Sequence, residues 1–153
     1  MKRPIARTLS LSCFLLMLAF VAAVVAYGQS APRSDVQAVR FESVDVFLDS
    51  FTHKLAAYQF ELLAAGGHAE IVGLEGGEHK AFAHAPYYDP AALQGNRVIV
   101  AAYSVDAELP TGKTRVARIH MQITGAEVPE YQIKIMETLG PGGEKIAVTA
   151  ESR

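Results

Sequence analysis

An alternation of apolar and polar side chains over residues 55–63 constrains the fold more than any other part of this chain. Tyr58, Phe60 and Leu62 fall on one side of an extended strand, and the Gln and Glu between them fall on the other. This period of two is typical of a β-strand with one buried face. A two-glycine break follows, and residues 70–74 are expected to form a second short strand.

Residues 1–28 have the pattern of a secretory signal peptide. Three basic residues precede an almost wholly apolar run at residues 9–25, and Ala26 and Gly28 suit the −3 and −1 positions of a cleavage site. We therefore expect an N-terminal signal helix that is cut near residue 28, and a mature protein that is secreted or periplasmic. The alternative is an uncleaved membrane anchor, because the apolar run approaches the ~18 residues at which a span becomes credible.

Removal of residues 1–28 would change the charge balance of the chain. It would take away three of the 14 basic residues and none of the 16 acidic ones, which leaves a net charge of −5. A negative domain is a poor ligand for nucleic acid or for an anionic membrane surface, so neither is an expected partner. The single Cys would be lost with the same segment, so stability must come from burial and not from disulfides.

Short alternating runs recur along the rest of the chain. Val44, Val46 and Leu48 share one face of an expected strand. The uniformly apolar residues 97–103 predict a central strand that is buried on both faces. Between these runs, Asp89 precedes a proline and can cap a short helical turn.

Residues 114–124 also alternate. One predicted face carries Ala117, Ile119, Met121 and Ile123, and the other carries Val116, Arg118, His120 and Gln122. A later strand around residues 131–135 is followed by a glycine-rich turn at residues 140–143. This pattern predicts a hairpin whose return strand is formed by residues 145–149.

The number and spacing of these runs predict the fold class. About eight short strands are separated by turn signals, and no convincing long helix follows residue 28. This pattern is typical of an all-β protein, and we predict an antiparallel β-sandwich of jelly-roll type. Residues 29–37 are polar and aperiodic and are expected to form a flexible leader, with the sandwich domain over residues 38–150.

The order of these elements resembles the cohesin family, which are β-sandwich modules of bacterial extracellular assemblies. The segments that carry the resemblance are residues 44–48, 55–62, 70–77, 97–101 and 114–119. The resemblance implies a flattened jelly roll related to carbohydrate-binding modules, and a sheet face that binds a dockerin domain. No short motif transfers individual dockerin-contacting residues to this chain, so none is assigned from the resemblance.

A polar sheet face is one candidate for partner binding. Arg118, His120 and Gln122 share the face of one strand, and a protein partner could bind there. The alternative is the ordinary solvent-facing side of an antiparallel sheet.

Aromatic residues in the irregular segment at residues 74–94 are a second candidate. Phe82, Tyr87 and Tyr88 could stack on a sugar ring, as in a carbohydrate-binding module that takes a polysaccharide, or they could anchor a protein partner. The alternative is that one or more of them fill the core.

Catalytic and metal-binding motifs are not found in the sequence. His79 and His84 lie five residues apart and would point to opposite faces of a strand, so no metal site is expected. The nucleophile, zinc-protease and phosphate-loop motifs are missing, and no cofactor is implied. The sequence therefore predicts a non-catalytic module that recognises a protein or, alternatively, a polysaccharide.

Overall fold

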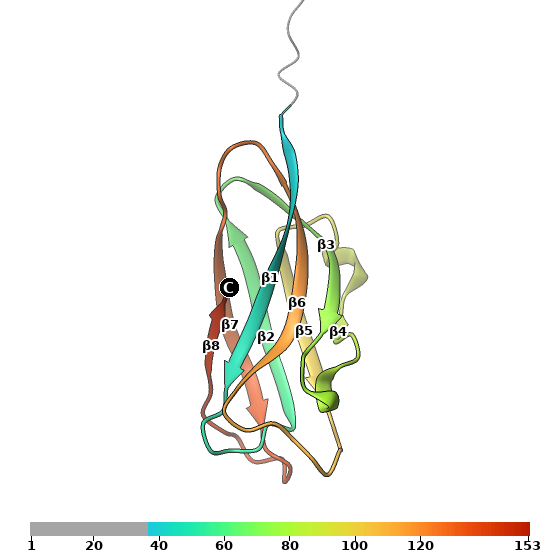
Figure 1. Ribbon diagram of the computed structural model, residues 1–153, viewed down its shortest axis with the longest axis vertical. Coiled ribbons are helices and arrows are strands. Elements are labelled where there is room, and N and C mark those ends of the chain that lie inside the picture. The colour runs from blue at the N-terminus through green and yellow to red at the C-terminus, as the bar shows by residue number, and fades with distance from the viewer. Residues whose placement is uncertain (1–36) are drawn as a thin grey trace, which may run out of the picture. The chain divides into compact units, whose positions relative to one another are not determined.

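Residues 37–153 are described by the computed structural model, and they form an all-β sandwich of two antiparallel sheets (Figure 1). The predicted signal helix, and all but the last residue of the predicted leader, lie outside the described residues. The strands are β1 (Val39–Asp49), β2 (Ala57–Ala65), β3 (His68–Gly76), β4 (Tyr87–Tyr88), β5 (Arg97–Tyr103), β6 (Lys113–Thr124), β7 (Glu130–Leu139) and β8 (Thr149–Ser152).

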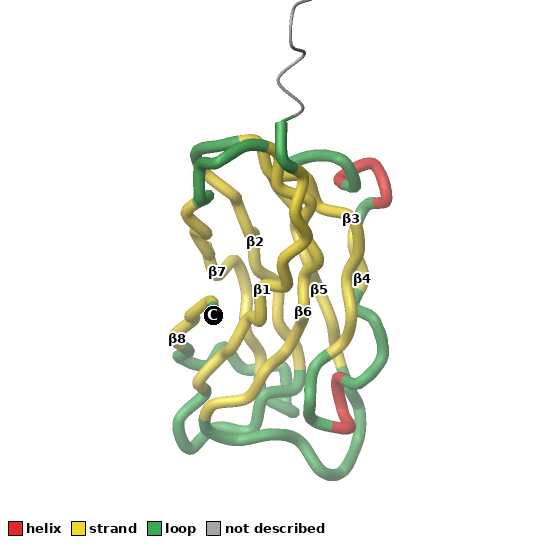
Figure 2. Tube along the Cα trace, turned by 45° about the horizontal axis from the view of Figure 1, so that its top comes forward, coloured by secondary structure: helices red, strands yellow, loops and turns green. Residues whose placement is uncertain are grey.

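The two sheets have four strands each. One, here called the β6 sheet, has the order β3-β6-β1-β8, and the other, the β2 sheet, has the order β4-β5-β2-β7. Two short 3₁₀ turns, η1 (Lys80–Phe82) and η2 (Pro90–Ala92), lie at the side where β3 leads to β4 and β5 (Figure 2). No helix among the described residues is long and apolar enough to cross a membrane. The predicted all-β sandwich is confirmed for this part of the chain.

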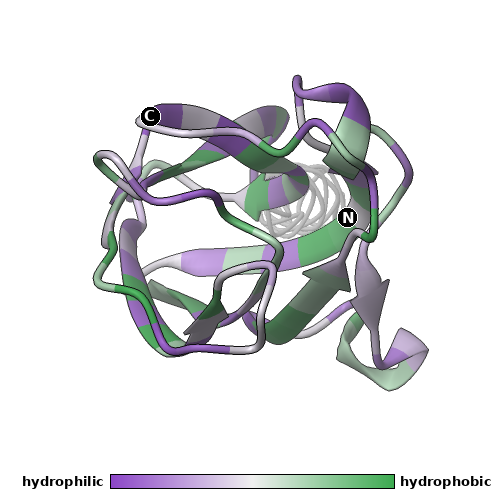
Figure 3. Cartoon of the chain, turned by 90° about the horizontal axis from the view of Figure 1, so that it is seen from below, coloured by the Kyte–Doolittle hydropathy of each residue, from purple (hydrophilic) through white to green (hydrophobic). Residues whose placement is uncertain are grey.

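The core lies between the sheets and follows the predicted alternation. Tyr58, Phe60 and Leu62 of β2 are at most 3% exposed. They pack with the apolar residues predicted from β1 and β6, which are Val44, Val46, Leu48, Ala117, Ile119, Met121 and Ile123. Hydrophobic and hydrophilic residues alternate along the strands in Figure 3, as expected where one face is buried and the other meets solvent.

A β-bulge in β6 corrects one prediction. In the ladder with β1, Val46 lies opposite Ala117 and Phe47 opposite Arg115, so Val116 has no counterpart on β1. The extra residue changes the alternation, and both Val116 and Ala117 are fully buried. The prediction that Val116 shares the solvent-facing side with Arg118 is therefore wrong.

The hydroxyl of Tyr58 lies at this bulge. Its Oη donates a hydrogen bond of 2.9 Å to the carbonyl oxygen of Val116, and this bond joins the β2 sheet to the β6 sheet. Burial raises the pKa of Tyr58 well above its ordinary value, so the hydroxyl keeps its proton and acts as a donor.

Strand β5 differs from its prediction in one respect. It lies inside its sheet between β4 and β2, as a central strand should. However, only Val98 and Val100 are fully buried, while Ile99 and Ala101 are half-buried on the outer side. No described element packs on that outer face, so the prediction of burial on both faces is wrong.

The segment after β7 also differs from its prediction. Leu139 and Lys145 form an isolated bridge, and the amide of Ile146 donates to the carbonyl of Thr138 at 3.1 Å. The chain then leaves the β2 sheet, and β8 pairs with β1 of the other sheet. The predicted return strand at residues 145–149 is therefore wrong, because this segment crosses between the sheets.

The capped turn is confirmed. Asp89 precedes η2, and its Oδ1 accepts a hydrogen bond of 2.9 Å from the amide of Ala91. Pro90 occupies the first helical position, where its missing N–H costs nothing.

We predict that Tyr58→Phe lowers the free energy of unfolding by about 1–3 kcal/mol, because it leaves the buried carbonyl of Val116 without a partner. Tyr87→Phe is the matched control, since the Tyr87 side chain is 69% exposed and its hydroxyl is not in the core. Its expected change is within about 0.5 kcal/mol. Urea denaturation followed by circular dichroism measures both values, and equal losses in the two variants would contradict the role given to Tyr58.

Candidate recognition surfaces

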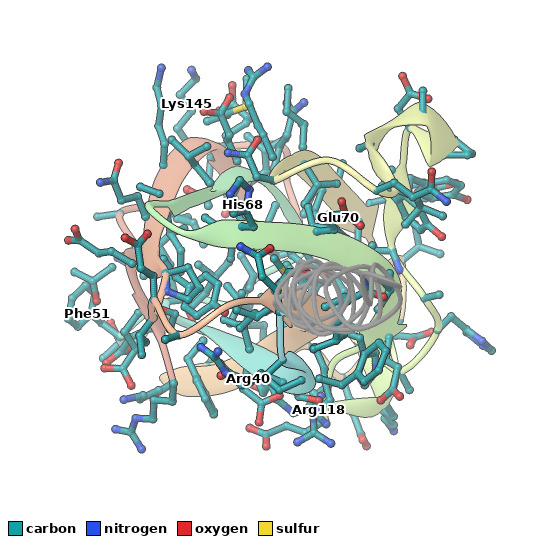
Figure 4. The ribbon with its side chains drawn as sticks, turned by 90° about the horizontal axis from the view of Figure 1, so that it is seen from above. Arg40, Phe51, His68, Glu70, Arg118 and Lys145 are labelled. Atoms are coloured by element: carbon teal, nitrogen blue, oxygen red, sulfur yellow. The ribbon has the colours of Figure 1, made fainter. Side chains whose placement is uncertain are left out.

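The outer face of the β6 sheet carries a pair between Arg118 and Asp45. Arg118 donates from Nε to Asp45 Oδ1 at 2.7 Å and from a terminal nitrogen to Oδ2 at 2.8 Å. Arg115 lies 3.7 Å from the same carboxylate. The hydrogen bond from Arg118 is the main cause that lowers the pKa of Asp45 below its ordinary value. In Figure 4, Arg118 lies on the opposite side of the sandwich from Lys145, which pairs with Glu137 of the β2 sheet.

His120 and Gln122 lie on the same face as Arg118. His120 has Nε2 2.8 Å from Glu75 Oε1 and Nδ1 3.0 Å from Ser43 Oγ. Gln122 is half-buried and lies in register with Phe41 on β1 and Glu70 on β3. The structure thus brings the three predicted partner-binding residues together, but two of them already bind groups of their own sheet.

Further charges extend this arrangement toward β8. Phe47 lies 5.5 Å from Lys113 Nζ and 5.5 Å from the guanidinium carbon of Arg153, measured to the ring centroid. Both cations also pair with Glu151. We call these paired groups of β1, β6, β3 and β8 the β6-sheet charge network. Most of its charges are neutralised within the sheet, so a partner that binds there must compete with existing pairs.

The outer face of the β2 sheet is different in character. Tyr87 and Tyr103 are 69% and 66% exposed, and their rings are nearly parallel, with 7° between planes and 6.3 Å between centroids. Ala101 lies opposite Tyr87 and Ala57 opposite Tyr103 in the ladders, so small side chains surround the rings. We call Tyr87, Tyr103, Ile99, Ala57 and Ala101 the tyrosine patch.

Shallow hollows flank the two rings of the tyrosine patch. One of about 210 Å³ is bordered by both tyrosines, by Ala57 and Ala101, and by Glu137 of β7. A second of about 460 Å³ lies toward η1 and is bordered by both rings, His84 and Asp106 among others. The patch therefore presents aromatic ridges beside depressions, with polar groups at its margin.

The structure separates the three aromatic residues predicted to bind sugar. Phe82 is 3% exposed, and its ring meets the Tyr58 ring edge-on at 5.1 Å, so it is a core residue and the prediction of a sugar contact there is wrong. Tyr88 points inward and packs against the core, while its neighbour Tyr87 points outward. This split follows from the alternation of side chains along β4.

Tyr103 was missed in the sequence reading although a signal for it existed. It ends the run at residues 97–103, whose apolar composition predicts burial on both faces. Strict alternation along that run would have placed Tyr103 with Arg97 and Ile99 on the outer face. The stacking of Tyr103 with Tyr87 could not be predicted, because it depends on the register between β4 and β5, and no sequence pattern gives that register.

His79 of the irregular segment has a structural role. His79 Nδ1 accepts a hydrogen bond of 3.2 Å from the amide of Ala81 and caps η1. Within residues 37–153, no group of three His, Cys, Asp or Glu side chains is arranged to hold a metal ion.

Comparisons with known proteins identify the fold. No protein-family model matches the sequence, and no curated protein matches it. Two solved structures are similar: a non-cellulosomal cohesin from the hyperthermophilic archaeon Archaeoglobus fulgidus and the seventh ScaB type I cohesin from Pseudobacteroides cellulosolvens. The first has a TM-score of 0.53 at 15% identity, over 72% of this chain and 75% of the other. The second has a TM-score of 0.55 at 10% identity, over 78% of this chain and 83% of the other. The chain therefore has a cohesin-like β-sandwich fold, as the sequence resemblance predicted.

We predict that the free energy of unfolding of Asp45→Asn falls less steeply than that of the parent as the pH is lowered into the acid range. Because the pKa of Asp45 is lowered in the folded state, its contribution is present above the pKa of the unfolded chain and is lost as pH falls through the folded value. The variant should be less stable than the parent by about 1 kcal/mol or less at pH 6, and the difference should shrink as the pH falls below the ordinary pKa of an Asp side chain, about 3.9. Denaturant midpoints across this range measure the effect. Glu70→Gln, a substitution at an exposed residue of β3, is the control. Its stability should depend on pH in the same way as that of the parent chain.

Proposed function

We propose that this protein is an exported, non-catalytic module that recognises another protein through the tyrosine patch on the outer face of the β2 sheet. The observation that carries the proposal is the pair of exposed, nearly parallel rings of Tyr87 and Tyr103. Tyrosine is enriched among the residues that dominate binding energy at protein interfaces, because it offers a large rigid surface and a polar end.

The two sheet faces differ in the free-energy cost of binding a partner protein. On the β6 sheet, a partner would have to desolvate or break the Arg118–Asp45 and His120–Glu75 pairs. Removing water from an ion pair offsets much of the gain from new contacts. On the tyrosine patch, the exposed area is largely aromatic and aliphatic, so its burial is favourable. This difference favours the patch over the face of Arg118, His120 and Gln122.

Features of the sequence support the proposed partner and the proposed location. The cohesin-like fold and the sequence resemblance support a dockerin-like domain as the partner. The signal-peptide pattern at residues 1–28 supports export to the periplasm or the outside of the cell. The lack of a recognised catalytic motif in the sequence supports a role in recognition rather than in chemistry.

We predict that the double variant Tyr87→Ala/Tyr103→Ala binds dockerin domains at least about 30-fold more weakly than the parent chain, the loss expected when an aromatic hot spot is removed. Isothermal titration against a panel of purified dockerin domains measures this change. The matched control is Arg118→Gln/His120→Gln on the opposite sheet, whose affinity should stay within about threefold of the parent. Circular dichroism establishes that both variants are folded.

Two results would contradict the proposal. If the tyrosine variant binds as tightly as the parent chain and the Arg118/His120 variant loses affinity, the interface lies on the β6 sheet instead. Retention of the parent chain on insoluble polysaccharide, lost in the tyrosine variant and accompanied by no dockerin binding, would replace protein recognition with carbohydrate binding.

A further inference from the structure

Three polar side chains form a line across the outer face of the β6 sheet. Ser43 comes from β1, His120 from β6 and Glu75 from β3, and these strands are neighbours in the sheet (Figure 1). The His120 ring joins the other two side chains. Its Nδ1 lies 3.0 Å from Ser43 Oγ, and its Nε2 lies 2.8 Å from Glu75 Oε1. A hydroxyl and a carboxylate are therefore linked through the two nitrogens of one imidazole ring.

The strand ladders bring these side chains together. Ser43 and His120 lie directly opposite each other in the ladder between β1 and β6. On the other side of β6, a bulge in β3 puts Gly73 opposite His120, and Glu75 follows two residues further along β3. Gly73 has no side chain, and a Cβ atom there would lie 3.8 Å from the ring carbon Cδ2. The ring can therefore lean over Gly73 and reach the carboxylate of Glu75.

The two hydrogen bonds define where the protons lie. An ionised carboxylate can only accept, so the neutral ring of His120 carries its proton on Nε2 and donates it to Glu75. Nδ1 then has a free lone pair and accepts the hydroxyl proton of Ser43. In nucleophilic catalysis a histidine held in this way by a carboxylate removes the proton from a serine hydroxyl.

The neighbouring charges favour the same proton transfer. When the ring takes the proton of Ser43 it becomes positive, and Glu75 pairs with it directly. The next charged groups on β1 and β6 are Asp45 and Arg118, which form a bidentate pair with each other. The charge of Asp45 is therefore balanced by a cation and opposes negative charge on the Ser43 oxygen only weakly.

Reagents in solvent can reach the hydroxyl. Ser43 is exposed, and the side chain of His120 is 34% exposed. The two hollows described above lie at the tyrosine patch, and neither is bordered by Ser43, His120 or Glu75. Those hollows cannot hold a substrate against Ser43 for repeated turnover. The reaction expected here is a single modification of the serine, which agrees with a non-catalytic role for the module.

We propose that Ser43 is a nucleophile activated by His120, and that it takes an acyl group from an activated ester. Ser43 Oγ attacks the ester carbonyl, and the bond from Oγ to the carbonyl carbon forms. The bond from that carbon to the leaving oxygen breaks, and the leaving group departs with the electron pair. The hydroxyl proton passes to His120 Nδ1 and then to solvent water. Glu75 is a positioning residue that holds the ring with Nδ1 free.

This site is independent of the tyrosine patch. The two lie on different sheets and share no residue. A failure of one proposal therefore leaves the other untouched.

Reaction of the full 153-residue chain with p-nitrophenyl acetate tests the proposal. Peptide mass spectrometry over time gives the acetylation rate of each residue. Ser104 is the internal reference, because its Oγ accepts a hydrogen bond from the amide of Asp106 and has no histidine partner among the described residues. Ser43 should be acetylated at least about tenfold faster than Ser104, since a positioned base accelerates such steps by about 10²–10⁴-fold in enzymes.

Three variants separate the base from a structural contact. His120→Gln keeps a polar side chain but cannot take the proton, so Ser43 should react as slowly as the reference serine. Glu75→Gln should give an intermediate rate, because the amide oxygen can still accept from Nε2 but carries no charge. Glu70→Gln, an exposed change on the same strand, is the matched control and should keep the parent rate. Circular dichroism establishes that each variant is folded.

The pH profile gives a readout that a structural role would not produce. In the parent chain, the acetylation rate of Ser43 should rise with pH and level off once the His120 ring is neutral. In His120→Gln this plateau should be missing.

Two results would overturn the proposal. If Ser43 reacts no faster than Ser104, or reacts equally fast in His120→Gln, the ring only links the strands. If the acetyl group is found on His120 and not on Ser43, the reactivity belongs to the ring itself.

Discussion

The hydrogen bond from the Tyr58 hydroxyl to the Val116 carbonyl joins the two sheets at the β-bulge in β6, and the arrangement of the sandwich depends on that bulge. Val116 is the extra residue of the β6 bulge and is fully buried, so its backbone carbonyl needs a hydrogen-bond partner within the protein. The bond satisfies that carbonyl and links the centres of the two sheets. The bond lies at the point in β6 where the alternation of inward and outward side chains changes. That change decides the face of the sheet on which every later side chain of β6 lies.

Beyond the bulge, the inward residues of β6 complete the core and the outward residues are Arg118, His120 and Gln122. Arg118 and His120 pair with acidic and hydroxyl side chains of β1 and β3, so much of this face is a network of mutual pairs. The outer face of the β2 sheet also carries ion pairs, Arg97–Glu61 and Lys145–Glu137, but Tyr87 and Tyr103 themselves are 69% and 66% exposed. One sheet therefore satisfies most of its own polar groups, and the other presents aromatic surface to solvent. This asymmetry is the physical basis for assigning recognition to the β2 sheet.

Alternation alone was sufficient to predict the strands with one buried face, the core residues of β1, β2 and β6, and the sandwich class. The Asp89-Pro90 cap was also readable, because its geometry is local. The bulge at Val116 could not be predicted, because an extra residue in a strand is recognised only when the pairing with the partner strand is known. The path of residues 145–149 and the pairing of Tyr87 with Tyr103 failed for the same reason: both depend on contacts between distant segments. Phe82 was misjudged because an aromatic residue in a loop can point into the core or away from it.

The most direct test of the central claim is to map the bound surface. Amide and methyl chemical shifts of the folded chain would be recorded during titration with the dockerin domain that binds most tightly. The account predicts that the largest changes fall on Tyr87, Tyr103, Ile99 and Ala101 of the β2 sheet, with little change at Arg118 and His120. Changes centred on Arg118, His120 and Gln122 would contradict it, and would place recognition on the charged face of the β6 sheet.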